Sequence, residues 1–133
     1  MALDSGALIE LLEGTPRGLK LLDSIRTASL IPHVSLVNIA ETEYIICRKE
    51  GHASAEKRID AIIGSGFLKV EDDASIHRIA SGIKCARALA LADCYTLAVA
   101  EATSSTPLFA MKERELLKEM EREPFPTQPV FLE

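Results

Sequence analysis

No run of apolar residues in this 133-residue chain approaches the roughly 18 that a membrane-spanning helix requires. The N-terminus, Met1–Asp4, also lacks the basic segment followed by an apolar one that marks a signal peptide. Internal repeats, low-complexity tracts and linkers are absent as well. We therefore expect a soluble, cytoplasmic protein with a single domain over residues 1–133, since about 100–200 residues per domain is usual.

Cysteine and histidine, the softer metal ligands, are scarce, with three residues of each type. The cysteines are an odd number at wide spacings without a Cys-x-x-Cys pair, which argues against a zinc ribbon and favours reduced core thiols. The histidines form no metal-ligand spacing, and we interpret them as surface residues. The six residues are Cys47, Cys85, Cys94, His33, His52 and His77.

Positive charge is in deficit, because 15 Lys and Arg face 20 Asp and Glu and the formal net charge is −5. A protein that binds a polyanion by counterion release carries a basic patch and a high isoelectric point. If this chain acts on nucleic acid, a bound divalent cation is the obvious means of neutralising the phosphates. The chain is 47% hydrophobic and 26% charged, a balance that favours a packed core over disorder.

Short apolar segments that are typical of strands recur along the chain. The predicted strands are Met1–Leu3, Ala28–Val34, Phe67–Val70, Thr106–Ala110 and Pro129–Leu132. The last of them is expected at a sheet edge, because Pro129 cannot donate a ladder hydrogen bond.

Helical patterns fill the segments between these strands. Two short helices follow the first strand, and Thr15 caps the second, which has Pro16 at its first position. A longer helix starts at Ser35 and closes at Gly51, with a predicted apolar side of Val37, Ala40, Tyr44 and Cys47. Further helices are predicted over Ser54–Ile63, Asp73–Ala88, the alanine- and leucine-rich Ala88–Ala102, and Lys112–Arg122. The alternation predicts a three-layer α/β/α fold, with a central parallel sheet of four to five strands.

Four carboxylates stand where such a sheet binds its ligands, at the carboxyl ends of the strands or on helices that begin there. Asp4 ends the first strand, and Glu41 borders the predicted apolar side of the helix after the second. Asp93 opens the helix before the fourth strand, and Glu113 follows that strand. These four residues are the candidate catalytic and metal-binding set.

Three of these carboxylates also have a purely structural interpretation. Asp4 can cap the helix that follows it, because Asp accepts hydrogen bonds from first-turn amides. Asp93 is the one charged residue between Arg87 and Glu101. It either caps a helix or binds a cation, and its apolar setting favours the cation. Glu113 lies in a charge run, which usually forms a solvated helix face.

A cluster of carboxylates requires a compensating cation, because like charges at close range cannot all remain ionised. Oxygen ligands without histidine or thiolate suit Mg²⁺ or Mn²⁺ rather than zinc. Such an ion orients water against a phosphodiester and stabilises the leaving oxygen, so the chemistry needs no protein nucleophile.

Taken in order, these motifs resemble a PIN domain, similar to the toxin half of a VapBC toxin–antitoxin pair. They are Leu3-Asp4-Ser5 before a helix, Ile39-Ala40-Glu41 in a long helix, Ala90-Leu91-Ala92-Asp93 opening an alanine-rich helix, and an acid after the last core strand. The resemblance extends over nearly the whole chain, including its length and element order. It implies a sheet of order 3-2-1-4-5, divalent-metal-dependent cleavage of RNA, and commonly a homodimer paired with an antitoxin.

By the same resemblance, Asp4, Glu41 and Asp93 match the acidic triad of the family. The family's fourth acid is usually Asp in a Thr-x-Asp setting, whereas this chain has Met111-Lys112-Glu113. Glu115, two residues further on, is expected on the solvent side of its helix. The departure leaves open an alternative function, a catalytically weakened PIN-fold protein that binds RNA or protein without cleavage.

A phosphoryl-transfer protein with Asp4 as the acceptor is a second alternative on a similar sheet. A haloacid-dehalogenase-like phosphatase requires a second Asp two residues after the first, and Gly6 occupies that position. A receiver domain requires a pair of acids before the acceptor strand, and this chain has none. Both readings are therefore disfavoured.

Overall fold

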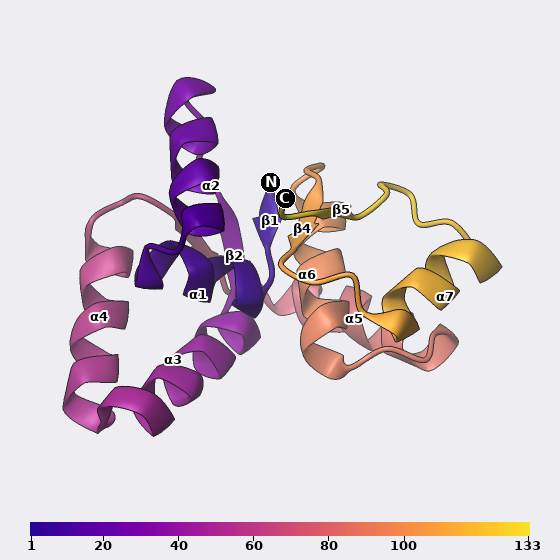
Figure 1. Cartoon of the computed structure of the whole chain (residues 1–133). Coiled ribbons are helices and arrows are strands. Elements are labelled where there is room, and N and C mark those ends of the chain that lie inside the picture. The colour runs from indigo at the N-terminus through magenta and orange to yellow at the C-terminus, as the bar shows by residue number, and fades with distance from the viewer.

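A five-stranded, all-parallel sheet of order β3-β2-β1-β4-β5 lies at the centre of the computed structural model, which describes residues 1–133 (Figure 1). The strands are β1 (Ala2–Leu3), β2 (His33–Ser35), β3 (Lys69–Glu71), β4 (Pro107–Phe109) and β5 (Val130–Phe131). This order and the helical layers on both faces confirm the fold predicted from the sequence. The order reverses between β1 and β4, where such sheets bind ligands at their carboxyl edge.

Seven helices connect and cover the strands. They are α1 (Ser5–Glu13), α2 (Pro16–Thr27), α3 (Leu36–Glu50), α4 (His52–Gly64), α5 (Ala74–Ala86), α6 (Leu91–Ala102) and α7 (Arg114–Arg122). The predicted cap of α2 is confirmed, because Thr15 Oγ1 accepts a 3.0 Å hydrogen bond from the Gly18 N–H and Pro16 is the first helical residue. Ser35 caps α3 in the same way through the Asn38 N–H.

Alternation along the central strands divides the core into two layers. Leu3 of β1 and Leu108 of β4 pack with α1–α4, whereas Ala2 and Phe109 pack with α5–α7. Successive strand residues point to opposite faces, so neighbouring residues serve different layers. Figure 1 shows the same division, with α1–α4 on the left of the sheet and α5–α7 on its right.

All five strands are shorter than the segments predicted for them, and β2 and β3 begin furthest from the predicted start. The β2 strand begins at His33 rather than Ala28, because Ala28 and Ser29 form the turn after α2 and Pro32 has no N–H to donate. The β3 strand begins at Lys69 rather than Phe67. Phe67 and Leu68 contribute to the core by packing with the α1–α4 layer, without pairing in the ladder.

The buried face of α3 differs from the one predicted by apolar spacing. Ala40 and Tyr44 are exposed and Val37 and Cys47 are half-buried. The buried positions are instead Asn38, Ile39, Thr42 and Ile46. Two of these four residues are polar, so an argument from apolar periodicity could not identify this face.

The cysteines are all free thiols, but only Cys94 is a core residue; Cys47 is half-buried and Cys85 is exposed. The prediction of core thiols is therefore confirmed for Cys94, met only in part at Cys47, which packs against the core, and wrong for Cys85. Among the histidines, His33 Nδ1 lies 2.7 Å from Glu71 Oε1 across the β2–β3 pair, as part of a hydrogen-bonded surface. None of the seven helices combines the length and apolar character needed to cross a membrane.

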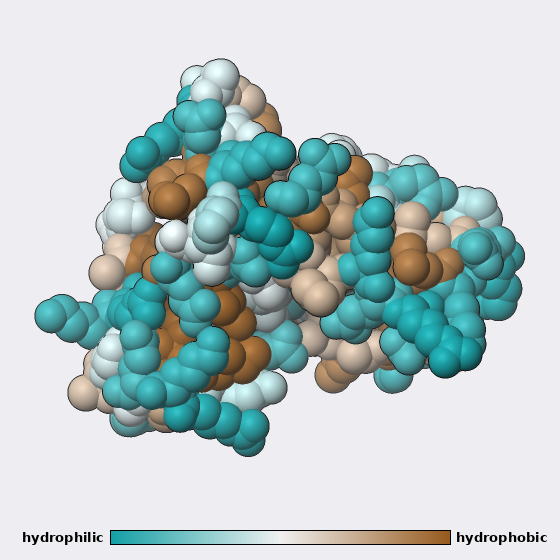
Figure 2. Space-filling view, in the orientation of Figure 1, coloured by the Kyte–Doolittle hydropathy of each residue, from teal (hydrophilic) through white to brown (hydrophobic).

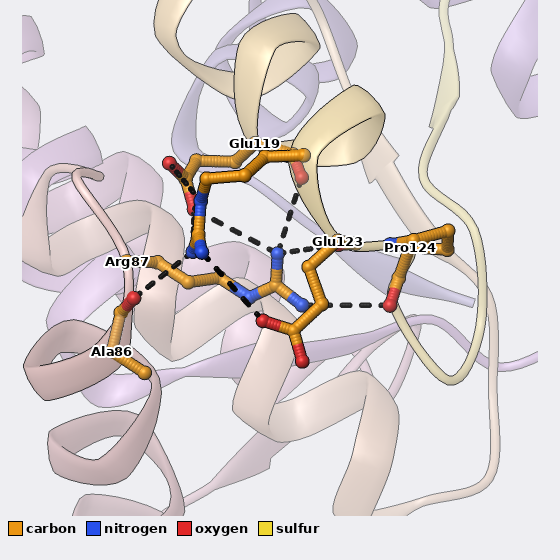
Figure 3. A network of polar contacts seen from close by, with 6 residues as sticks. Ala86, Arg87, Glu119, Glu123 and Pro124 are labelled. Atoms are coloured by element: carbon orange, nitrogen blue, oxygen red, sulfur yellow. Dashed lines mark hydrogen bonds and ion pairs between the residues drawn. The ribbon is translucent and has the colours of Figure 1, made fainter.

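A polar cluster fastens α7 to the end of α5 (Figure 3). Arg87 Nη1 donates hydrogen bonds to the backbone oxygens of Glu119 (3.2 Å) and Glu123 (2.6 Å), and its guanidinium lies 3.8 Å from the Phe125 ring centre. Glu119 also pairs with Arg122 at 2.7 Å, and this contact lowers the pKa of the Glu119 carboxyl. The cluster thus fixes the helix that begins just after β4.

Candidate active site

The Asp4 side chain lies at the carboxyl end of β1 and caps α1. Its Oδ1 accepts hydrogen bonds from the backbone N–H groups of Ala7 (2.7 Å) and Ala110 (3.2 Å). Burial raises the pKa of the Asp4 carboxyl to about 7 against the lowering effect of these two hydrogen bonds, and the charges of Asp93 and Glu113 raise it further. The capping interpretation is therefore right for Asp4, but the two hydrogen bonds do not offset the cost of burying its negative charge.

Asp93 lies in the first turn of α6 and is half-buried. The N-cap position of this helix is Ala90, and no side chain caps it, so Asp93 does not play the capping role considered for it. Burial, followed by the charges of Glu113, Glu41 and Glu115, raises the pKa of the Asp93 carboxyl to about 6. The positive end of the helix dipole favours an anion here, but the carboxylate has no cationic partner.

Glu41 and Glu113 approach the same place from α3 and from the start of α7. Glu41 is half-buried, whereas Glu113 is exposed at the N-cap position of α7 and forms no capping hydrogen bond. Both act on the pKa of Asp93, as does Glu115. Glu115 is exposed, as expected for the solvent side of its helix, although its charge also raises the pKa of Asp93.

The structure thus brings the four predicted carboxylates into one electrostatic neighbourhood at the carboxyl edge of the sheet. No group of three or more His, Cys, Asp or Glu side chains is packed closely enough to hold a metal ion as the side chains stand. Every charged group that shifts the pKa of Asp4 or Asp93 is acidic. The donor set, carboxylate oxygens without a neutralising Arg or Lys, fits a hard divalent cation.

A buried polar network that sequence reasoning missed joins the segments carrying three of these acids. The Asn38 side-chain amide donates to Ser5 Oγ (3.1 Å) and to the Ala92 carbonyl (3.3 Å), and its Oδ1 accepts from Ser35 Oγ. Ser5 follows Asp4 in sequence, and Ala92 precedes Asp93. The available signal was a polar residue one helical turn before Glu41 in an otherwise apolar segment.

The segment after β4 is held by a second set of residues that the sequence did not reveal as functional. Arg17 Nη1 of α2 donates to the Ala110 carbonyl (3.0 Å), and its Nη2 pairs with Glu10 (2.9 Å). A Cβ added to Gly6 would lie 2.7 Å from the Ala110 Cβ, so only glycine leaves room for this segment. Gly6 was a visible signal, since it lies two residues after the acid that ends the strand, but nothing in the sequence indicated that Ala110 would be its neighbour in space.

Comparison with protein families and with known proteins gives two results at the sequence level. The family profile described as PIN domain matches residues 1–123. Curated protein sequences give no match.

Several solved structures have a similar fold over most of the chain. One is VapBC2 from Rickettsia felis bound to a DNA fragment from their promoter, with a TM-score of 0.71 and 13% identity over 99% of this chain and 98% of that one. Another is VapC20 from Mycobacterium tuberculosis, a toxin that cleaves the sarcin-ricin loop, with a TM-score of 0.62 and 16% identity over 81% and 85%. FitAB bound to an IR36 DNA fragment gives a TM-score of 0.61 and 20% identity over 98% and 93%.

Proposed function

The chain belongs to the PIN-domain family, and on this basis we propose that it is a metal-dependent endoribonuclease that hydrolyses RNA phosphodiester bonds. We propose further that it is the toxin of a VapBC-type toxin–antitoxin pair, with residues 1–133 acting as one PIN-like domain in the cytoplasm. The observation that carries the proposal is the pair Asp4 and Asp93, two half-buried carboxylates with raised pKa values and no cationic partner. Such acids at the reversal point of a parallel sheet are typical of a catalytic site.

Mg²⁺ or Mn²⁺ is the proposed cofactor, held by Asp4, Glu41, Asp93 and Glu113. When bound, a divalent ion activates water and stabilises the charge of the leaving oxygen. The protein's own residues orient the ligands: the Ala7 and Ala110 N–H groups hold one oxygen of Asp4, and the start of α6 directs Asp93. The net charge of −5 gives no general attraction for RNA, so the ion would also provide the local positive charge.

An antitoxin is the proposed protein partner, and a groove on the α1–α4 layer supports it. Leu11, Leu22, Ile62 and Phe67 line this groove of about 490 Å³ together with Arg26 and the Ser65–Gly66 turn. Figure 2 shows apolar surface gathered beside α1–α4 on the left of the view. The solved neighbours include VapBC2, named as a toxin–antitoxin pair.

The acidic site supports a second contact with the same partner. An Arg- or Lys-bearing antitoxin tail would pair with the uncompensated carboxylates and compete with the metal. We expect its affinity to fall as salt rises, because part of the attraction is between exposed charges. A short peptide with one central Arg, titrated at two salt concentrations, measures this effect.

A homodimer is also proposed, and two exposed leucines beside the site support it. Leu36 and Leu91 begin α3 and α6 and are 53% and 52% exposed. The Asn38–Ala92 hydrogen bond joins the first turns of these helices, so both leucines lie near that junction. A contiguous apolar patch on a surface marks a protein contact, and these two leucines would form the centre of such a patch. Sedimentation of the wild type and of a Leu36→Glu, Leu91→Glu variant tests the assignment.

The decisive experiment is RNA cleavage with and without Mn²⁺, for the wild type and for Asp93→Asn. We expect Mn²⁺-dependent cleavage by the wild type and its loss in Asp93→Asn, with the fold intact. Glu101→Gln, an exposed acid at the other end of α6, serves as the matched control and should cleave normally. Retained cleavage in Asp93→Asn would contradict its role as a ligand.

The alternative is a weakened PIN-fold protein that binds RNA or a partner without cleavage. The exposed, unpaired position of Glu113 favours it, because an exposed carboxylate contributes less to a metal site than a buried one. Absence of Mn²⁺-dependent cleavage by the wild type, together with binding of RNA, would support this alternative.

A further inference from the structure

The side chain of Asn38 meets all three segments that carry the Asp4, Glu41 and Asp93 carboxylates. We propose that Asn38 is a positioning residue for this acidic triad, which it holds in register through Ser5 and Ala92. The proposal rests on the proposed metal-dependent function of the site. Asn38 does not itself reach the reacting atoms, and its role is to fix the residues that do.

The hydrogen bonds of Asn38 define its orientation without ambiguity. The Ala92 carbonyl can only accept, so the Asn38 atom facing it at 3.3 Å must be the Nδ2 donor. The same Nδ2 donates its second proton to Ser5 Oγ at 3.1 Å, and Ser5 Oγ in turn donates to the Asn38 backbone carbonyl at 3.4 Å. Ser35 donates to Oδ1. Every polar atom of the side chain therefore has a partner.

Burial makes this network specific as well as complete. Asn38 and Ser35 are each 1% exposed and Ser5 is 3% exposed. An unpaired polar group at such a position is costly, so the segments cannot shift separately without breaking a buried contact. Because Ser5 adjoins Asp4 and Ala92 adjoins Asp93, each contact fixes a backbone position next to a carboxylate.

Other buried polar side chains nearby do not have this property. Thr42 Oγ1 donates to the Asn38 carbonyl and Thr96 Oγ1 to the Ala92 carbonyl, and each contact stays within its own helix. Asn38 alone crosses from α3 to both α1 and α6. The contrast separates a positioning role from the general packing of a polar core residue.

The test compares two substitutions of Asn38 with a matched substitution on the same helix. Asn38→Leu keeps the approximate size and removes both donors, whereas Asn38→Ala removes the side chain and admits water. Thr42→Val is the control, because Thr42 is 0% exposed and loses only a contact within α3. Three quantities are measured for each protein: the Mn²⁺ concentration that half-saturates the rise in thermal midpoint, and kcat and KM for RNA cleavage.

We expect both Asn38 variants to fold and to need about 10–100-fold more Mn²⁺ for half-saturation, the range found when groups that orient metal ligands are removed. The value of kcat should fall by a similar factor while KM for RNA changes little. In Thr42→Val all three quantities should stay near those of the wild type.

Two results would overturn the proposal. One is wild-type Mn²⁺ affinity and kcat in both Asn38 variants. The other is loss of the folded state in both, since Asn38 would then hold the fold rather than the site. Failure of the proposed function is distinguishable, because the wild type itself would then show neither a Mn²⁺-dependent midpoint nor cleavage.

Discussion

The Oδ1 atom of Asp4 accepts a hydrogen bond from the backbone N–H of Ala110, 106 residues further along the chain. The carbonyl of Ala110 accepts from Arg17 Nη1 on its other side. The end of β4 is thereby held between the first strand and α2. The segment that follows leads to Glu113, so these two contacts fix the start of the segment that carries the fourth acid.

Arg17→Gln should lower Mn²⁺-dependent cleavage by about tenfold, at the lower end of the effect of groups that orient metal ligands. Arg58→Gln is the matched control, because Arg58 also contacts a carboxylate (Glu50, 2.8 Å) and a backbone carbonyl (Leu12), but neither contact involves the segment after β4. Cleavage rates and thermal midpoints are measured for both variants. Equal losses of activity would contradict a specific role for Arg17.

Gly6→Ala should reduce both stability and cleavage, because the new Cβ would lie 2.7 Å from the Ala110 Cβ and push the end of β4 away from Asp4. Gly82→Ala on α5 has open space around the added methyl. It should stabilise the protein by about 0.5–1 kcal/mol, the usual gain for Gly→Ala inside a helix. Denaturant unfolding measures the free energy of unfolding of both variants. A more stable Gly6→Ala variant would contradict the prediction, because the segment around Ala110 would then move aside at little cost.

The stability of the metal-free protein should fall as pH rises from about 4 to about 8. Burial raises the pKa of Asp4 from 3.8 to about 7 and that of Asp93 from 3.8 to about 6. A raised pKa in the folded state means that the contribution to stability is complete below the unfolded value of 3.8 and is lost as pH passes through the folded value.

Thermal midpoints in EDTA across this pH range measure the effect. The midpoint of Asp93→Asn should depend less on pH and exceed that of the wild type at pH 8, since the variant lacks one of the two ionising groups. Saturating Mn²⁺ should raise the wild-type midpoint most at the upper end of the range, where both carboxylates are ionised. A wild-type profile in EDTA that rises from pH 5 to 8 would contradict the assignment.

Glu113→Gln should reduce cleavage by about 10–100-fold, the size of effect expected for a contact made through water. Asp4→Asn and Asp93→Asn should reduce it further, because these two are more buried than Glu113 among the proposed ligands. Glu115→Gln should have a smaller effect, since Glu115 is the last of the charges acting on Asp93. Glu121→Gln, exposed in the second half of α7, is the control.

This series is run at saturating Mn²⁺. A larger loss for Glu115 than for Glu113 would move the fourth acid two residues along the chain. No loss for either would leave a site that works with Asp4, Glu41 and Asp93 alone.

The fold was predictable from the sequence because its signals are local. The caps Thr15 and Ser35, the proline at the start of α2 and the apolar strand segments act within a few residues of where they stand. The acids Asp4 and Asp93 were visible for a related reason, since a charge in an apolar segment stands out in the sequence alone. The resemblance to a PIN domain added the strand order, which local patterns do not contain.

The tertiary structure decided what depends on contacts between distant segments. Apolar spacing placed Ala40 and Tyr44 on the buried side of α3, but the structure buries Asn38 and Thr42 instead. The reason is that hydrogen bonds from Asn38 to Ser5 and Ala92 set the rotation of the helix about its axis. Likewise nothing near Arg17 in sequence indicates Ala110. Polar partners are chosen by long-range packing, which periodicity cannot report. The sequence by itself determined which acids are candidates for the site, and only the folded chain decided which neutral and basic residues lie against the segments that carry them, because those contacts join residues far apart in sequence.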